Sequence, residues 1–118
     1  MFSTSFKASC ATGSDWQSVA RHCLQEIGTE PSRANLGFLY RTDSLAPYLQ
    51  MLLEEFRQKT GVRDWVGTVG AGICCTGREI YDEPAAAIML ATLPADSYRL
   101  IPSGINELSE ALQEHQSW

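Results

Sequence analysis

The apolar run at residues 85–93 constrains the fold of this chain more than any other feature. Almost every residue in it is apolar, Glu83 and Pro84 precede it, and Pro94 follows it. Its alanines would suit a helix, but the two prolines limit the run to the length of a strand. A strand that is apolar on both faces is typical of the buried centre of a sheet. We therefore predict a central buried strand here.

A clear amphipathic helix precedes this run. Ser14 and Gln17 have the spacing of a capping box, and Gly28 supplies the stop. The apolar side chains between them recur at helical spacing and form one stripe, made by Trp16, Val19, Ala20, Cys23, Leu24 and Ile27. The stripe predicts a helix that packs one face against a sheet.

Two further helices are predicted. The second follows Asp43 and Ser44, either of which can cap it, with Pro47 in its first turn and Gly61 at its end. Its apolar face consists of Leu45, Leu49, Leu52, Leu53 and Phe56. The third is predicted at 103–117, and its stripe consists of Ile105, Leu108 and Leu112.

Strand-length runs fill the intervals between the helices. We expect strands at 4–10, 36–40 and 65–75, the central strand at 85–93, and an edge strand at 97–101. The expected fold class is α/β in the order β-α-β-α-β-β-β-α, a single mixed sheet of about five strands packed by helices. Residues 1–118 form one domain in this interpretation.

The composition argues against several classes of partner. Fourteen acidic and nine basic residues give a net charge of -5, and no cluster of Lys or Arg offsets it. Such a surface repels phosphate, so we expect neither nucleic acid nor a membrane as a partner. The N-terminus has no secretory signal pattern, so we expect a cytoplasmic protein. In that compartment the four cysteines, Cys10, Cys23, Cys74 and Cys75, are expected to be reduced.

The glycine-rich stretch at 67–77 is the first candidate binding element. Glycine weakens a strand unless a bulge, a backbone or a ligand must come close. One interpretation is a bulged strand end at which Gly70, Gly72 and the Thr76 hydroxyl contact a ligand. The alternative is that the glycines allow the strand to pack tightly. The order GxxGxG is neither the dinucleotide fingerprint nor a phosphate loop.

Charged residues follow this stretch directly. Arg78 could clamp a carboxylate through two hydrogen bonds, and Glu79, Asp82 and Glu83 could hold an ammonium group, a combination that suits an amino acid. The alternative is a solvated loop between strands whose ion pairs contribute little to stability.

Several of these segments, taken in order, resemble the FIST N-terminal domain, a family named for F-box and intracellular signal transduction proteins. They are residues 6–8, the helix that begins at Asp15–Trp16, then 34–40, 65–74 and 76–85, and the resemblance covers 6–101. It implies a sensory domain for a small ligand such as an amino acid, beside a signalling partner or a second FIST-type domain. Family proteins are usually longer, so a pocket formed between two domains would be incomplete here.

The cysteines and histidines give weaker signals. Cys74 and Cys75 could act as a nucleophile, a redox pair or a soft-metal site, but no base is readable beside them, and neighbouring strand residues point to opposite faces. Buried small side chains are the simpler interpretation. The resemblance extends to some haem-linked proteins, for which His22 or His115 could serve as an axial ligand. We expect no cofactor and no metal site in this chain.

The leading hypothesis is a sensory domain that binds a small polar metabolite such as an amino acid near Gly70, Gly72, Thr76 and Arg78, at the carboxyl ends of the strands. The second hypothesis is a self-association or interaction module, because a half-module leaves a strand edge open and could form a homo-oligomer. A cysteine-dependent enzyme is the third, and we expect a binding protein rather than an enzyme.

Overall fold

The computed structural model describes residues 5–28, 33–75, 77–94 and 96–101. It confirms the mixed α/β class and shows two sheets. The elements follow one another in the order β1 (Ser5–Thr12), α1 (Trp16–Ile27), β2 (Leu36–Thr42), the 3-10 helix η1 (Asp43–Tyr48), α2 (Leu49–Thr60), β3 (Asp64–Gly70), β4 (Gly72–Cys75), β5 (Arg78–Tyr81) and β6 (Ala85–Thr92).

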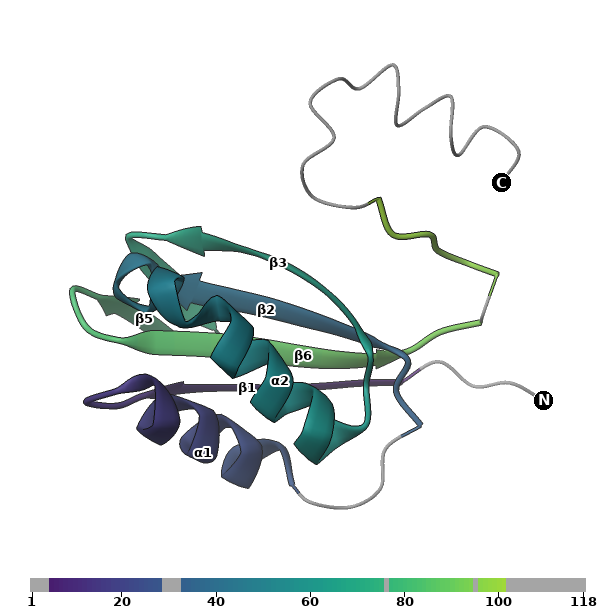
Figure 1. The fold of residues 1–118 in the computed structure, drawn as a ribbon, viewed down its shortest axis with the longest axis horizontal. Helices are drawn as coiled ribbons and strands as arrows, with labels where there is room; N and C mark the ends of the chain where they lie inside the picture. The colour runs from purple at the N-terminus through teal and green to yellow at the C-terminus, as the bar shows by residue number, and fades with distance from the viewer. Residues whose placement is uncertain (1–4, 29–32, 76, 95, 102–118) are drawn as a thin grey trace.

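The apolar run forms β6, which lies inside the main sheet as predicted (Figure 1). The strand order is β1-β6-β2-β3, with β6 antiparallel to both of its neighbours and β2 parallel to β3. Polar side chains at the two ends of β2 form hydrogen bonds with the backbone at the two ends of β6. Asn35, just before β2, exchanges two hydrogen bonds with the backbone of Leu93, and the Thr42 hydroxyl accepts a hydrogen bond of 3.0 Å from the Ala85 amide.

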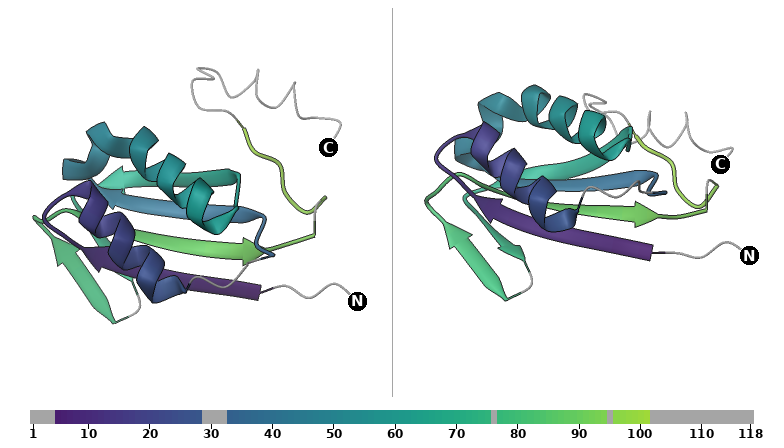
Figure 2. Two further views of the ribbon diagram at one scale, coloured as in Figure 1. Left: turned by 60° about the horizontal axis from the view of Figure 1, so that its bottom comes forward. Right: turned by 90° about the horizontal axis from the view of Figure 1, so that it is seen from below.

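Both α-helices cover the same face of this sheet (Figure 2). They pack against the alternate residues of the strands that point toward them, such as Leu39 and Ile88. In this layer, Phe56 of α2 stacks on the partly buried Trp65 of the edge strand β3, with ring centroids 5.6 Å apart. The buried residues of this core are Ala11, Val19, Ala20, Cys23, Ile27, Leu39, Leu45, Leu52, Phe56, Val62, Ala86, Ile88 and Leu90.

The opposite face of the sheet carries a hairpin of β4 and β5 near one end (Figure 2). Ile73 and Ile80 face each other across the hairpin and pack on Cys10, Ala85 and Ala87. The single strand predicted at 65–75 is therefore wrong in detail. The chain leaves the main sheet after Gly70 and starts a second sheet at Gly72, because Arg78–Tyr81, expected as a loop, supplies a partner strand.

The helix boundaries agree with the sequence except at their starts. Asp15 caps α1 in place of Ser14, because its carboxylate accepts the Ser18 amide at 2.8 Å. The segment after Thr42 begins as the 3-10 helix η1, and α2 starts at Leu49. Gly28 and Gly61 end the two helices with positive φ, as predicted.

The segment after β6 differs from the prediction. Residues 97–101 do not form a strand; instead, the Tyr98 hydroxyl bonds the Asn35 carbonyl oxygen at 3.0 Å and the Asp64 carboxylate at 3.1 Å. Burial, followed by the bond to Asp64, raises the pKa of Tyr98. The helix predicted at 103–117 lies outside the described residues. Among the residues described, no helix is long and apolar enough to cross a membrane.

Candidate ligand-binding site

The structure does not bring the predicted binding residues together. Gly70 ends β3 and Gly72 begins β4, whereas Arg78 pairs with Cys75 at the other end of the hairpin. Thr76 lies outside the described residues. Arg78 is therefore separated from Gly70 and Gly72 by the length of β4.

Close packing explains two of the glycines without a ligand. A Cβ atom at Gly72 would lie 2.5 Å from the Tyr81 ring and 2.7 Å from the Ile80 carbonyl oxygen. At Gly67 it would overlap the backbone of Leu39 on the neighbouring strand. The packing alternative thus accounts for Gly67 and Gly72, because only glycine allows these approaches.

Two cysteines expected as thiols form a disulfide. Cys10 of β1 is bonded to Cys75 of β4, so the prediction of reduced thiols is wrong for this pair. Cys74 is exposed and free, and Cys23 is fully buried. Burial, with a smaller contribution from Glu26, raises the pKa of the Cys23 thiol to about 12, so Cys23 stays protonated and is not a nucleophile.

The remaining charged candidates lie at the surface. Glu79, Asp82 and Glu83 are all exposed, as the solvated alternative predicts. His22 is also exposed, and its Nδ1 lies 2.9 Å from the Thr12 carbonyl oxygen, so it joins α1 to the end of β1. The described residues contain no group of three or more His, Cys, Asp and Glu side chains that could hold a metal ion. His115 lies outside them.

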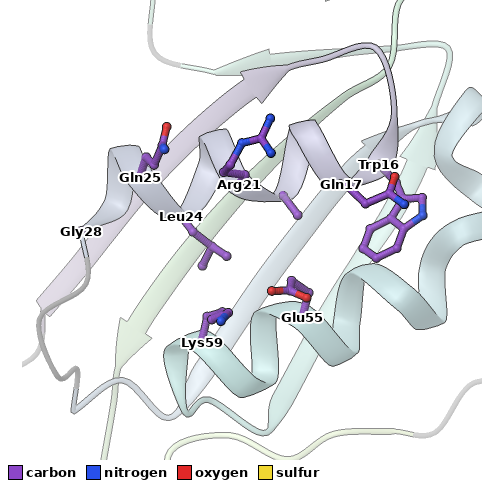
Figure 3. Close-up of a pocket in the computed structure, with 9 residues that line it drawn as sticks. Trp16, Gln17, Arg21, Leu24, Gln25, Gly28, Glu55 and Lys59 are labelled. Carbon is purple, nitrogen blue, oxygen red and sulfur yellow. The ribbon is translucent and has the colours of Figure 1, made fainter.

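The first of two large grooves runs between the helices (Figure 3). It has a volume of about 570 Å³. Trp16 and Leu24 of α1 point toward α2, from which Glu55 and Lys59 face them, and Arg21 of α1 also lines the groove. The charged groups here are long surface side chains, and a furrow of this kind arises wherever two amphipathic helices lie side by side. The groove therefore gives little chemical selectivity.

The second groove lies between α2 and the free edge of β3, with a volume of about 610 Å³. Its walls are largely apolar, and Arg41 is the one charged residue among the described residues that line it. The other lining residues are Leu39, Leu49, Leu53, Trp65, Val66, Gly67, Thr68, Val69, Leu100 and Ile101. This combination of apolar walls and one fixed polar group is typical of small-ligand sites.

Arg41 is placed in this groove by strand alternation. Leu39 faces the helices, so Arg41, two residues later on β2, lies on the same side. Its Nε is buried and has no hydrogen-bond partner among the residues that the structure describes. A buried guanidinium nitrogen without a partner costs free energy of folding, which a bound anion would recover.

Sequence reasoning missed Arg41 although a signal was available. In a strand, alternate residues lie on the same side, so Arg41 of the segment Leu36–Thr42 lies on the side of Leu39, which packs against the helices. A charged residue on the inward side of a strand is a candidate site. The prediction of 36–40 as the strand stopped one residue before it.

Neither a family model nor a curated protein matches the chain. Three chains of solved structures match it. One is TubZ from Bacillus thuringiensis serovar israelensis, in a GTPγS-form protofilament, with a TM-score of 0.40 and 17% identity over 97% of this chain. The matched region spans 29% of the TubZ chain. At this TM-score the likeness carries no argument about function.

Proposed function

We propose that this chain is a sensory domain that binds a small carboxylate with an apolar body, an apolar amino acid among the candidates, in the groove around Arg41. The observation that carries the proposal is the buried Nε of Arg41, for which the described part of the chain supplies no hydrogen-bond partner. The resemblance to the FIST N-terminal domain supports the same class of function. The proposed site therefore lies in the groove between α2 and β3, and not at Gly70, Gly72, Thr76 and Arg78, where the sequence analysis placed it.

The chemistry of the groove favours an anion over a neutral or cationic ligand. A guanidinium presents several donors in a plane and matches a carboxylate through two parallel hydrogen bonds. None of the described residues that line this groove is acidic, so none of them competes for Arg41. The apolar part of the ligand would lie against Trp65 and Leu53, where it leaves water.

The groove also offers a route for a signal. Leu100 and Ile101 form one wall, while α2 and β3 form the others. A ligand that contacts both sides would favour the conformations in which residues 100–101 lie on the groove. Such a population shift would reach whatever partner module follows or contacts this segment.

The test is a calorimetric titration with leucine, phenylalanine and phenylacetate, each compared with its amide, which lacks the charge. We expect the free carboxylates to bind and the amides to bind at least about tenfold more weakly, because the paired charge is lost. The variant Arg41→Met should lose binding. The matched variant Arg21→Met removes the same charge from the helix groove and should bind normally.

Arg41→Met also has a distinctive effect on stability. Because the buried Nε has no partner to lose among the described residues, the variant should unfold at the same urea concentration as the wild type or at a higher one. A variant that binds the carboxylates as well as the wild type, or a wild type that binds none of the three, would refute the proposed site.

A second function is favoured by the open edge of β3. No strand of the described residues pairs with its outer edge, and Val66 and Val69 are 38% and 41% exposed. Such an edge can pair with a second copy of the chain. Sedimentation at two concentrations separates the alternatives, since self-association raises the mass with concentration and Val69→Pro, which blocks strand pairing, should prevent it.

A further inference from the structure

The disulfide between Cys10 and Cys75 lies on the hairpin side of the sheet, away from the Arg41 groove. It joins β1 to β4 across 65 residues of sequence. Cys10 is only 4% exposed, whereas Cys75 is half-buried. The two sulfur atoms therefore differ in their access to solvent, and Cys75 is the one that a reagent can approach.

A cavity of about 210 Å³ lies beside this disulfide. Its lining includes Cys10, Cys75, Tyr40, Met89 and Arg78. Arg78 Nη1 lies 3.6 Å from Cys10 Sγ and donates to the Cys10 carbonyl oxygen at 3.3 Å. The guanidinium is thus held next to the less accessible of the two sulfur atoms.

We propose that Cys10–Cys75 is a thiol-exchange site for a low-molecular-weight thiol, with attack at Cys75 and with Arg78 stabilising Cys10 as it leaves. The incoming thiolate attacks Cys75 Sγ, a new S–S bond forms, the Cys10–Cys75 bond breaks, and its electron pair remains on Cys10 Sγ. A second thiol then attacks the mixed disulfide. It releases the Cys75 thiolate and forms the disulfide of the small thiol, so two electrons pass from the two thiols to the protein.

The geometry assigns a different role to each neighbouring group. Exchange is faster when the leaving thiol has a lower pKa, and a cation beside the sulfur lowers it. Arg78 occupies that position for Cys10. Cys74 is next to Cys75 in sequence and also lines this cavity, but it is a free thiol with no S–S bond to be attacked, so the attacked sulfur is that of Cys75.

Exchange at this site changes how the hairpin is held. Besides the disulfide and Arg78, the apolar contact with the sheet includes Ile73 and Ile80, which pack on small side chains such as Ala85 and Ala87. Breaking the bond therefore frees β4 and β5 to separate from the sheet while the helix layer stays packed. The site is therefore a reversible modification site whose redox state determines whether the hairpin stays attached to the sheet.

The first test maps the attacked sulfur in the wild-type protein. Oxidised protein is mixed with reduced glutathione, quenched with iodoacetamide after short intervals, and digested for mass spectrometry. We expect molecules that carry glutathione on Cys75 and the alkyl group on Cys10. Glutathione on Cys10, or reduction without any adduct on Cys75, would overturn the assignment.

The second test measures the rate of this reaction in charge variants. Arg78→Gln should slow the release of Cys10 roughly three- to tenfold, and Arg78→Lys should retain most of the rate. Arg21→Gln makes the same change in net charge on the helix side and should leave the rate unchanged, as should Cys74→Ser. Circular dichroism of the oxidised variants checks that each is folded.

Equal rates in Arg78→Gln and the wild type would refute the role of Arg78. A rate that collapses in Cys74→Ser would show that Cys74 is the reacting thiol, which contradicts the proposal. Hydrogen exchange supplies the structural readout. On reduction, the amides of β4 and β5 should lose protection while those of α1 and α2 keep it, and equal loss in both regions would show that no local release occurs.

Discussion

The two faces of the main sheet are held by different forces. On the helix face, α1 and α2 bury large side chains such as Phe56, Leu52 and Ile88 in one continuous core. On the hairpin face, Ile73 and Ile80 contact small alanines, and a disulfide completes the attachment. The attachment of the helices therefore depends on apolar burial, whereas the attachment of the hairpin also depends on the redox state of two cysteines.

β6 shows how one strand serves both faces. Ile88 and Leu90 point to the helices and fill the large core. Ala85 and Ala87 point the other way, and their small side chains let the hairpin approach closely. Side chains of alternate residues on a strand face opposite sides, so the sequence of β6 sets the thickness of each layer.

Phe56→Ala should produce the largest loss of stability. Phe56 is fully buried and stacked on Trp65, so its removal leaves a cavity between α2 and the sheet. We expect the free energy of unfolding in urea to fall by about 4 kcal/mol. Met51→Ala, on the same helix but 49% exposed, should change it little. A small effect of Phe56→Ala would contradict the view that burial dominates this face.

Cys75→Ala should have the next largest effect, and this effect should depend on redox conditions. Loss of a cross-link over 65 residues should lower the free energy of unfolding by roughly 2–4 kcal/mol under oxidising conditions. In excess reducing agent the variant and the wild type should unfold at nearly the same urea concentration. Cys74→Ala serves as the control and should behave as the wild type in both conditions. If the variant and wild type differ equally in both, packing and not the disulfide holds the hairpin.

The smallest effect is expected at Asp15, whose carboxylate caps α1 on the helix face and should make the stability of the protein depend on pH. Its carboxylate accepts hydrogen bonds from Ser18, chiefly from the backbone amide, and these lower its pKa below the ordinary value of 3.8. Because the folded-state pKa is depressed, the stabilisation is present above the unfolded pKa and is lost as the pH falls through the folded one.

The measurement compares melting temperatures of the wild type, Asp15→Ala and Asp15→Ser. The wild type should melt above Asp15→Ala near neutral pH, and the difference should shrink below a pH of about 4. Asp15→Ser keeps an uncharged cap, so its advantage over Asp15→Ala should not change with pH. A wild-type advantage that persists at low pH would show that the charge of Asp15 is not what caps α1.

The parts of the fold that could be predicted are those with local signals. The stripe from Trp16 to Ile27, the stops at Gly28 and Gly61, and the proline-bounded run of β6 all depend on spacing along the chain. The hairpin was not predictable in the same way. Arg78–Tyr81 is polar and short, and it forms a strand because β4 lies beside it and Ile80 finds Ile73 across the pair.

The same distinction between local signals and contacts of distant segments applies to the candidate sites. The side chain of Arg78 was singled out from the sequence, but the pairing of Cys10 with Cys75 beside it joins residues far apart in the chain. The groove around Arg41 is formed by β2, α2, β3 and residues 100–101, so its existence depends on how these segments pack.

By itself, the sequence of this protein determined the α/β class, the first helix and the central strand, because apolar periodicity and proline act within a few residues. Only the tertiary structure decided which glycines are required for packing, which cysteines form a bond and which arginine faces a groove. These outcomes depend on contacts between distant segments, and no local pattern encodes the distance between them.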